Sequence, residues 1–108
     1  WNTARSECYA SGYHLVTIDD VSENDWVDLT VDSYSSATWW IGYNDVATEG
    51  SFVWEDGSLS TYSNWHSGEP NDLDNNEDCA ELNYWTDGSW NDKTCSVTMN
   101  YVCEAEAL

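Results

Sequence analysis

Residues 69–79 read Glu-Pro-Asn-Asp-Leu-Asp-Asn-Asn-Glu-Asp-Cys, a run of carboxylates and side-chain amides around one proline. A shorter run of the same kind, Trp-Asn-Asp, follows at residues 90–92. Neither run contains Lys or Arg, so the carboxylates repel one another at neutral pH unless a cation lies among them. Calcium takes roughly six to eight oxygen ligands of these types. The X-Pro bond is also where a cis peptide costs little free energy, and a cis turn would let Glu69 and Asn71 contact the same ion.

The order of the motifs along the chain is informative. Glu69-Pro70-Asn71 is followed by Glu77 directly before Asp78-Cys79, and later by Trp90-Asn91-Asp92 ahead of Cys95. This order resembles the sugar-binding calcium site of the C-type lectin domains, and Trp40-Ile41-Gly42 resembles a core strand of the same family. The resemblance covers nearly the whole chain. It implies an α+β fold in which two helices flank small antiparallel sheets, with a long calcium-binding loop.

The length and the cysteines agree with one small secreted domain. The chain has 108 residues, and we assign residues 1–108 to a single carbohydrate-recognition domain. Four cysteines without zinc-finger spacing predict two disulfides and an oxidising compartment, so a secreted or cell-surface protein is expected. Their spacing alone leaves the pairing open. The family resemblance implies Cys8 with Cys103, which would tie the two ends together, and Cys79 with Cys95, which would brace the calcium loop.

The charge excludes some partners. The formal net charge is -19, and Arg5 and Lys93 are the only strong cations. Nucleic acids and anionic membranes are therefore not expected to bind through simple electrostatics. No stretch is apolar over a length that spans a bilayer, so direct membrane insertion is not expected, and a signal peptide is expected to have been removed or to lie outside this sequence. Acidic residues away from the two runs are interpreted as a solubilising surface: Asp19, Asp20, Glu23, Asp25, Glu104 and Glu106.

The apolar pattern predicts helices and short strands. One helix is expected over residues 1–11, and a second from an N-cap near Ser22 to residues 33–36. The expected buried side chains of the second helix are Trp26, Val27 and Leu29. Strands are expected over residues 14–18, 37–43, 52–54, 80–84, 89–91 and 100–104. The strand with which the family usually opens has no counterpart before Trp1, so we expect this domain to lack it.

The resemblance implies a primary calcium site. Its ligands would be Glu69, Asn71, Glu77, Asn91 and Asp92, which offer carboxylate and amide oxygens. These side chains do not saturate calcium, so sugar hydroxyls can complete the coordination. In the family, Glu-Pro-Asn accompanies mannose, N-acetylglucosamine, glucose or fucose, whereas galactose binders carry Gln-Pro-Asp. The resemblance therefore implies glycans or glycoproteins of the mannose type as partners.

A second, auxiliary calcium site is also implied. The candidates match by type and spacing a site of mannose-binding family members, and Glu77 would be shared between the two ions. They are Asp45, Glu49, Asp72, Glu77 and Asp78. The alternative is an acidic loop that is simply solvated.

Other residues give weaker signals. His14 and His66 are single histidines without matching partners, and we interpret them as exposed or core residues rather than as metal ligands. Tyr84 and Trp85 could stack on a sugar, although a strand aromatic more often packs inside. Trp65 is expected to pack beneath the loop. Leu73 is expected near the sugar, where it would tune selectivity.

Catalysis is not expected. A glycosidase needs two carboxyls, one of them with a raised pKa, whereas calcium ligation holds carboxylates ionised. The sequence also contains no paired histidines and no phosphate-binding loop.

Three functional interpretations of different kinds remain. The resemblance favours a calcium-dependent lectin, weak at each site and strengthened by multimerisation or by repetition in a larger chain. A second is an adhesin or an ice-binding, antifreeze-like module in which calcium only shapes the loop. A third, suggested by charge alone, is an acidic matrix protein associated with a mineral.

Overall fold

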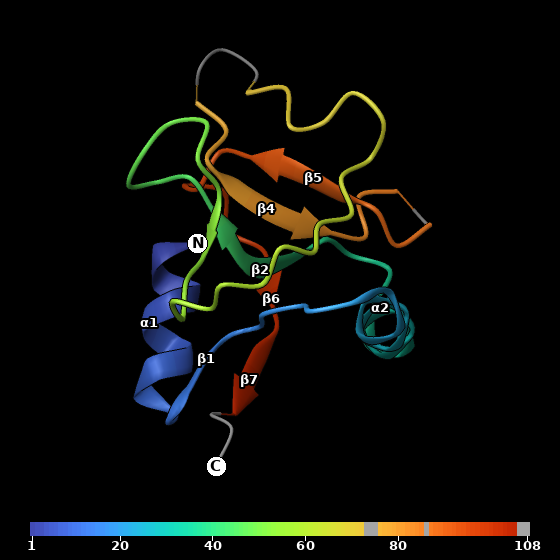
Figure 1. The fold of residues 1–108 in the computed structure, drawn as a ribbon. Coiled ribbons are helices and arrows are strands. Elements are labelled where there is room, and N and C mark those ends of the chain that lie inside the picture. Colours follow the sequence, from blue (N-terminus) through green and yellow to red (C-terminus); the bar gives the residue numbers. More distant parts are fainter. Residues whose placement is uncertain (73–75, 86, 106–108) are drawn as a thin grey trace.

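The computed structural model describes residues 1–72, 76–85 and 87–105. Within these residues it has two helices and two small sheets, which confirms the predicted α+β class (Figure 1). The helices are α1 (Asn2–Ala10) and α2 (Val21–Tyr34). The strands are β1 (Tyr13–Leu15), β2 (Trp39–Asn44), β3 (Val53–Trp54), β4 (Cys79–Leu82), β5 (Trp90–Lys93), β6 (Asn100–Tyr101) and β7 (Cys103–Ala105).

Val102 connects the two sheets. β1 and β7 form an antiparallel pair, while the larger sheet has the order β3-β2-β4-β5 with β6 parallel to β2. The Val102 amide donates to the Trp40 carbonyl at 3.2 Å, and the Val102 carbonyl accepts from the Val16 amide at 2.9 Å. The closing strand predicted over residues 100–104 is therefore divided into β6 and β7, because the chain changes sheets between them.

Helix α2 begins earlier than the sequence predicted. Asp20, rather than Ser22, is the N-cap, and its Oδ1 accepts the Glu23 amide at 2.8 Å. Glu23 Oε1 in turn accepts the Asp19 amide at 2.7 Å. A carboxylate at this position pairs with a first-turn amide and with the positive end of the helix dipole. An acidic helix start was correctly predicted, but it was placed two residues too late.

The buried face of α2 also differs from the prediction. Asn24, Val27 and Val31 are the buried residues, and their spacing of three and four places them on one side. Trp26 and Leu29, predicted as buried, are 67% and 70% exposed. The prediction is confirmed for Val27 and wrong for Trp26 and Leu29, because it took the largest apolar side chains for the inner face. Within the described residues, no helix combines the length and the apolar character needed to cross a bilayer.

The core consists of two apolar clusters that share β2. Trp40 is 1% exposed and belongs to one cluster, whereas Ile41 belongs to the other. Trp39 packs against the cluster of Ile41. Neighbouring residues of a strand point to opposite faces, which is why Trp39 and Trp40 contact different clusters.

Trp90 is fully buried in the larger cluster and connects it to α2. Its indole Nε1 donates to Asn24 Oδ1 at 2.8 Å, and Asn24 Nδ2 donates to the Gly88 carbonyl at 2.9 Å. A buried indole N–H needs such a partner. The contact fixes the start of β5, the strand that carries Asn91 and Asp92.

The long polar region before β4 is anchored by Trp65. On either side of this residue, the Trp90 amide donates to the Asn64 carbonyl at 2.8 Å, and the His66 amide donates to the Trp90 carbonyl at 2.9 Å. The Trp65 ring lies 4.9–6.1 Å, centroid to centroid, from the rings of Phe52, Tyr43 and Trp90. The prediction that Trp65 packs beneath the loop is confirmed.

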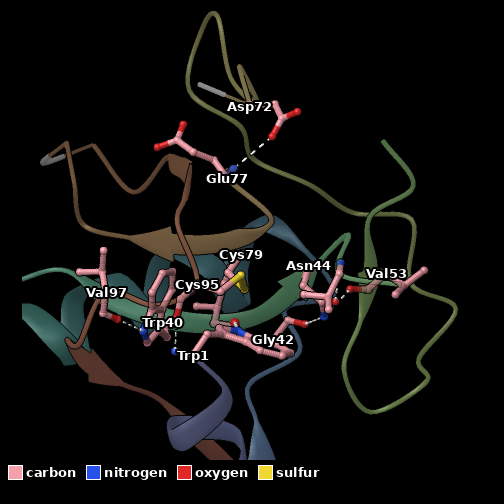
Figure 2. Close-up of a disulfide and its surroundings, with 12 residues drawn as sticks. Trp1, Trp40, Gly42, Asn44, Val53, Asp72, Glu77, Cys79, Cys95 and Val97 are labelled. Atoms are coloured by element: carbon pink, nitrogen blue, oxygen red, sulfur yellow. Dashed lines mark hydrogen bonds between the residues drawn. A yellow bond between two sulfur atoms is a disulfide. The ribbon is translucent and has the colours of Figure 1, made fainter. Parts of the chain in front are cut away.

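Both implied disulfides are present. Cys8 pairs with Cys103, 95 residues apart, and Cys79 pairs with Cys95, 16 residues apart. In the chain-entropy model, loops of these lengths correspond to about 4–5 and about 3 kcal/mol of stabilisation. Figure 2 shows the Cys79–Cys95 bond on the loop side of β2, with Asp72 and Glu77 beyond it.

Candidate calcium and carbohydrate site

The predicted primary ligands come from three segments of the fold. Asn91 and Asp92 lie on β5, Glu77 lies two residues before β4, and Glu69 and Asn71 flank Pro70 in the long loop. The Glu69-Pro70 peptide is cis, as the sequence suggested. The described part of the loop arches above β4 and β5 (Figure 1).

Asp92 holds the loop to the sheet. Its carboxylate is fully buried, and both oxygens accept backbone amides from the loop. Oδ1 accepts the Asn71 amide at 3.1 Å, and Oδ2 accepts the Asp72 amide at 2.7 Å. A carboxylate oxygen can accept more than one bond, so these contacts orient Asp92 and still leave it able to bind a cation.

Glu69 lies against Asp92 and is strongly perturbed. Burial, together with the hydrogen bond and charge of Asp92 and a smaller contribution from Glu77, raises the pKa of Glu69 to about 7. In the described structure, Glu69 Oε1 is buried without a hydrogen-bond partner. Two acidic groups in contact can share one proton, or both can ionise if a cation lies between them.

Glu77 and Asp72 connect the loop to β4. Glu77 is buried, and its amide donates to Asp72 Oδ1 at 3.1 Å, the contact drawn in Figure 2. Asp72 has a φ of 46°, a left-handed conformation that Asp and Asn adopt more readily than most residues. The backbone of Asp72 therefore turns the chain, and its side chain accepts the Glu77 amide.

Asn91 is oriented by Glu81, a residue that the sequence pattern did not indicate. Glu81 lies directly opposite Asn91 in the β4–β5 pair, and Glu81 Oε1 accepts from Asn91 Nδ2 at 2.7 Å. Glu81 is 1% exposed, and burial raises its pKa while the Asn91 bond lowers it. The hairpin register could have identified this pair, because Ala80–Tyr84 and Ser89–Asn91 were predicted as adjoining strands. Residues of this kind commonly tune metal affinity from outside the ligand set.

Three of the predicted auxiliary ligands lie together. Carboxylate oxygens of Asp45, Glu49 and Asp78 are within 4.8 Å of one another. Asp45 is buried, and its Oδ2 accepts the Gly50 amide at 2.8 Å. The pKa of Glu49 is raised to about 7, first by the hydrogen bond with Asp45 and then by burial and neighbouring carboxylates, and burial raises the pKa of Asp78. Asp72 adds negative charge to both Glu49 and Asp78.

The acidic residues of the primary set are more widely spread. Among the described residues, Glu69, Glu77 and Asp92 do not form a group with all ligand atoms within 4.8 Å. Ligands on opposite sides of calcium lie about 5 Å apart, since each Ca–O bond is about 2.3–2.6 Å long. The spacing is therefore compatible with an ion that also takes amide oxygens from Asn71 and Asn91.

Both donor sets fit calcium on chemical grounds. Carboxylate and amide oxygens are hard ligands of the type that calcium prefers, and neither set includes Lys or Arg. Exposed acidic clusters are common without an ion, so buried oxygens that lack a hydrogen-bond partner are stronger evidence for a cation site. Across the described ranges, Glu69 Oε1, Asp45 Oδ1 and Asp78 Oδ1 are buried and lack a hydrogen-bond partner. Buried polar atoms normally have a partner, and a cation would provide one.

The weaker candidates are placed as follows. The ring of His66 stacks on Trp85 with centroids 3.7 Å apart, and Tyr84 meets Trp85 edge to face. His66 Nδ1 also lies 2.9 Å from Ser89 Oγ. Trp85 therefore packs on a histidine on one side, and Tyr84 is 52% exposed. Leu73, predicted near the sugar, lies outside the described residues.

The architecture is that of a C-type lectin-like domain. The structure of the C-type lectin CEL-I from Cucumaria echinata matches with a TM-score of 0.89 and 29% identity, covering 95% of this chain and 80% of that one. A cow CD23 domain, solved in the presence of GlcNAc2Man3 oligosaccharide, matches with a TM-score of 0.85 and 32% identity, covering 100% of this chain and 81% of that one. A calcium-independent type II antifreeze protein matches with a TM-score of 0.84 and 25% identity, covering 95% of this chain and 75% of that one.

The family is shown by the sequence as well. The Lectin C-type domain model matches residues 1–105, and the chain belongs to this family. The hepatic lectin of Gallus gallus is 38% identical over 106 residues, which is 96% of this chain and 49% of that protein. The perlucin-like protein of Mytilus galloprovincialis is 39% identical over 107 residues, or 95% of this chain and 68% of that protein. The chain thus spans about half the length of the hepatic lectin.

Proposed function

We propose that this domain binds carbohydrate through a calcium ion held by Glu69, Asn71, Glu77, Asn91 and Asp92. The observation that carries the proposal is the contact between the carboxyl groups of Glu69 and Asp92. Within the described residues, Glu69 Oε1 is buried there and has no hydrogen-bond partner. Such a pair is stabilised by a cation. The family membership supports carbohydrate binding, and lectins among the relatives support binding rather than catalysis.

The side chains around the ion can bind the sugar directly. When bound, calcium supplies coordination positions that two neighbouring hydroxyls can fill. Ionised Glu69 and Glu77 only accept hydrogen bonds, whereas Asn71 and Asn91 can also donate. Asn91 gives one amide hydrogen to Glu81 and retains the other. Each hydroxyl could therefore donate to a carboxylate and accept from an amide.

The proposed ligand class is mannose, N-acetylglucosamine or fucose. The support is the Glu69-Pro70-Asn71 sequence, which in the family accompanies equatorial 3- and 4-hydroxyls or the equivalent pair in fucose. The cow CD23 domain, which shares 32% identity, was solved with an oligosaccharide that contains mannose and N-acetylglucosamine. Both observations favour this class over galactose.

We further propose an auxiliary calcium ion at Asp45, Glu49, Asp72, Glu77 and Asp78. The close approach of Asp45, Glu49 and Asp78 supports it, as does the buried Asp45 Oδ1. The Glu77 amide donates to Asp72 Oδ1, so the two remaining members of the set are in contact. The auxiliary ion would order the loop rather than contact the sugar.

The setting of the domain follows from the same features. The two disulfides favour an oxidising compartment, and we propose that the protein works outside the cell or at its surface. Single lectin sites are weak, so repetition within a longer chain or multimerisation would raise avidity.

A glycan array tests the proposal. The protein is applied with calcium, with EDTA, and with EDTA followed by excess calcium, and bound signal is challenged with mannose, fucose and galactose. We expect binding to mannose-type glycans that EDTA abolishes, calcium restores and mannose inhibits. Binding that survives EDTA, or that only galactose inhibits, would contradict the proposed site.

A second candidate function is ice binding. The likeness to a calcium-independent type II antifreeze protein favours it, although at 25% identity. An ice-recrystallisation assay in EDTA separates the two candidates. Inhibition of recrystallisation without calcium, together with an empty glycan array, would favour ice binding, whereas the proposed lectin site predicts no inhibition.

A further inference from the structure

His14 is buried next to two carboxylates, far from the calcium loop in sequence. It is 4% exposed and lies on β1 directly opposite Glu104 on β7. The turn after β3 brings in Asp56. His14 Nε2 is 3.8 Å from Asp56 Oδ2 and 3.7 Å from Glu104 Oε1, and the three ligand atoms lie within 4.8 Å of one another. His14 has no matching partner in the sequence, and the fold supplies two.

The hydrogen bonds of the ring determine what Nε2 offers. His14 Nδ1 lies 2.7 Å from the Leu15 carbonyl oxygen. A carbonyl only accepts, so Nδ1 carries the hydrogen and the neutral ring has a lone pair on Nε2. That lone pair faces two carboxylates, an arrangement that a positive charge between them would stabilise. Histidine ligands of metals commonly donate their other ring N–H to a backbone carbonyl in this way.

Both carboxylates are held in place by backbone amides. Asp56 Oδ1 accepts the Ser58 amide at 2.9 Å, which leaves Oδ2 toward His14. Glu104 Oε1 accepts the Thr17 amide at 3.1 Å. The positions of the two carboxylates therefore depend on the fold and not on the histidine alone.

The surrounding pocket gives independent support for a bound ligand. It is lined by His14, Thr17, Asp19, Asp56, Ser58 and Glu104. Thr17 is 4% exposed, and its Oγ1 is buried without a hydrogen-bond partner in the part of the chain described. No Lys or Arg lines this pocket, and Arg5 is paired with Glu55 instead.

We propose that His14, Asp56 and Glu104 form a binding site for zinc, distinct from the calcium sites. One imidazole and two carboxylates suit zinc, whereas calcium prefers oxygen ligands alone. Tetrahedral zinc, with bonds of about 2.1 Å, places its ligands about 3.4 Å apart, which is close to the separations of 3.8 and 3.7 Å between His14 Nε2 and the two carboxylates. Thr17 Oγ1 would then pair with a water in the fourth position. The ion would tie the β1–β7 sheet to the turn after β3.

Zinc titration in excess calcium tests this inference, because calcium occupies the oxygen-rich loop sites. Calorimetry of the wild-type protein should give one zinc per chain. Nitrogen NMR of the two histidines should show a large shift of His14 Nε2 on zinc addition, with Nδ1 remaining protonated. The inference would be overturned if the His14 ring stayed unchanged at saturating zinc, or if it were already protonated on both nitrogens at neutral pH and excluded the metal.

Matched variants separate this site from others. His14→Gln and Asp56→Asn should each weaken zinc binding at least about tenfold. Asp56 lies on an exposed turn, and asparagine keeps the acceptor for the Ser58 amide, so the fold is retained. His66→Gln removes the other histidine and should leave the affinity unchanged. Equal zinc affinity in wild type and Asp56→Asn, or loss of binding in His66→Gln alone, would contradict the assignment.

Discussion

At the scale of single residues, the candidate calcium site depends on side chains that fix other side chains. Asp92 holds the loop through the Asn71 and Asp72 amides, and Glu81 holds the Asn91 amide group. Because Glu81 accepts a hydrogen bond from the side-chain NH2 of Asn91, the amide oxygen of Asn91 points away from Glu81 and remains available to an ion. The candidate ligands are thus held by other groups of the protein, which reduces the free-energy cost of ordering them on binding.

Replacing Glu81 tests this positioning role. Glu81→Met fills the same buried space without an acceptor, and we expect the calcium affinity to fall on the order of tenfold, since ligand-orienting partners have effects of about that size. Glu81→Gln is the matched control, because it keeps an oxygen for the Asn91 amide and removes the same charge. Calcium calorimetry measures both. Equal affinities in the two variants would show that Glu81 acts only through its charge.

Exchanging donors and acceptors should change sugar preference. Glu69→Gln with Asn71→Asp reverses the hydrogen-bonding character around each hydroxyl while the total charge of the site stays the same. Each mismatched bond costs about 1 kcal/mol, so we expect the ratio of mannose to galactose affinity to fall on the order of tenfold or more. Competition assays with the two monosaccharides provide the measurement. An unchanged ranking in a variant that still binds calcium would exclude the proposed hydroxyl contacts.

At the scale of elements, α2 and the β4–β5 hairpin support the site from below. Asn24 in α2 bonds to Trp90 and to the Gly88 carbonyl, and Trp90 begins the strand that carries Asn91 and Asp92. The start of α2 depends on Asp20. The helix therefore contributes to the site through the hairpin although it supplies no ligand.

The N-cap of α2 can be tested directly. Asp20→Ala removes the acceptor of the Glu23 amide, and we expect a loss of about 1 kcal/mol in the free energy of unfolding. Asp20→Asn is the control, because it removes the same negative charge but retains a capping oxygen. Urea denaturation in calcium compares the two. A stability of Asp20→Ala equal to that of Asp20→Asn would mean that charge, and not capping, decides the effect.

Elements that depend on local sequence patterns could be predicted, whereas those that depend on contacts between distant residues could not. The strand around Trp40 and the hairpin leading to Trp90 have strong local patterns, and both were predicted. The inner face of α2 was not, because Asn24 is buried through hydrogen bonds to a distant hairpin and Trp26 is exposed. The division of the last strand at Val102 likewise depends on a sheet change that no local pattern records.

The same distinction applies to the candidate sites. The Glu69-Pro70-Asn71 run and the disulfides could be predicted because the family resemblance covers them. Glu81 is separated from Asn91 by a turn, and finding the pair required the register of the hairpin. The His14 cluster joins β1, β7 and the turn after β3, so no spacing in the sequence reveals it.

At the scale of the whole molecule, charge is the dominant feature. With a net charge of -19 and two strong cations, the folded chain concentrates carboxylates that the unfolded chain can separate. Neighbouring carboxylates contribute to the raised pKa values of Glu49 and Glu69. Bound cations would relieve this repulsion only in the folded state.

Calcium should therefore raise the melting temperature. At a concentration about 100 times the dissociation constant, one site adds about 2.7 kcal/mol of stability, which corresponds to a rise on the order of 10 °C for a domain of this size. Magnesium at equal concentration is the control, because it screens charge equally but fits an all-protein calcium site poorly. Scanning calorimetry gives the measurement. Equal shifts with the two ions would attribute the effect to screening.

The most direct test of the proposed lectin function is a titration of methyl α-mannoside into the protein, first with calcium in excess and then in EDTA. We predict saturable binding with calcium, none in EDTA, and full recovery when calcium is restored. Asp92→Asn should abolish the binding even in calcium. Mannoside binding that persists in EDTA, or its absence from a protein shown to hold calcium, would contradict the proposal that the sugar completes the coordination of the ion.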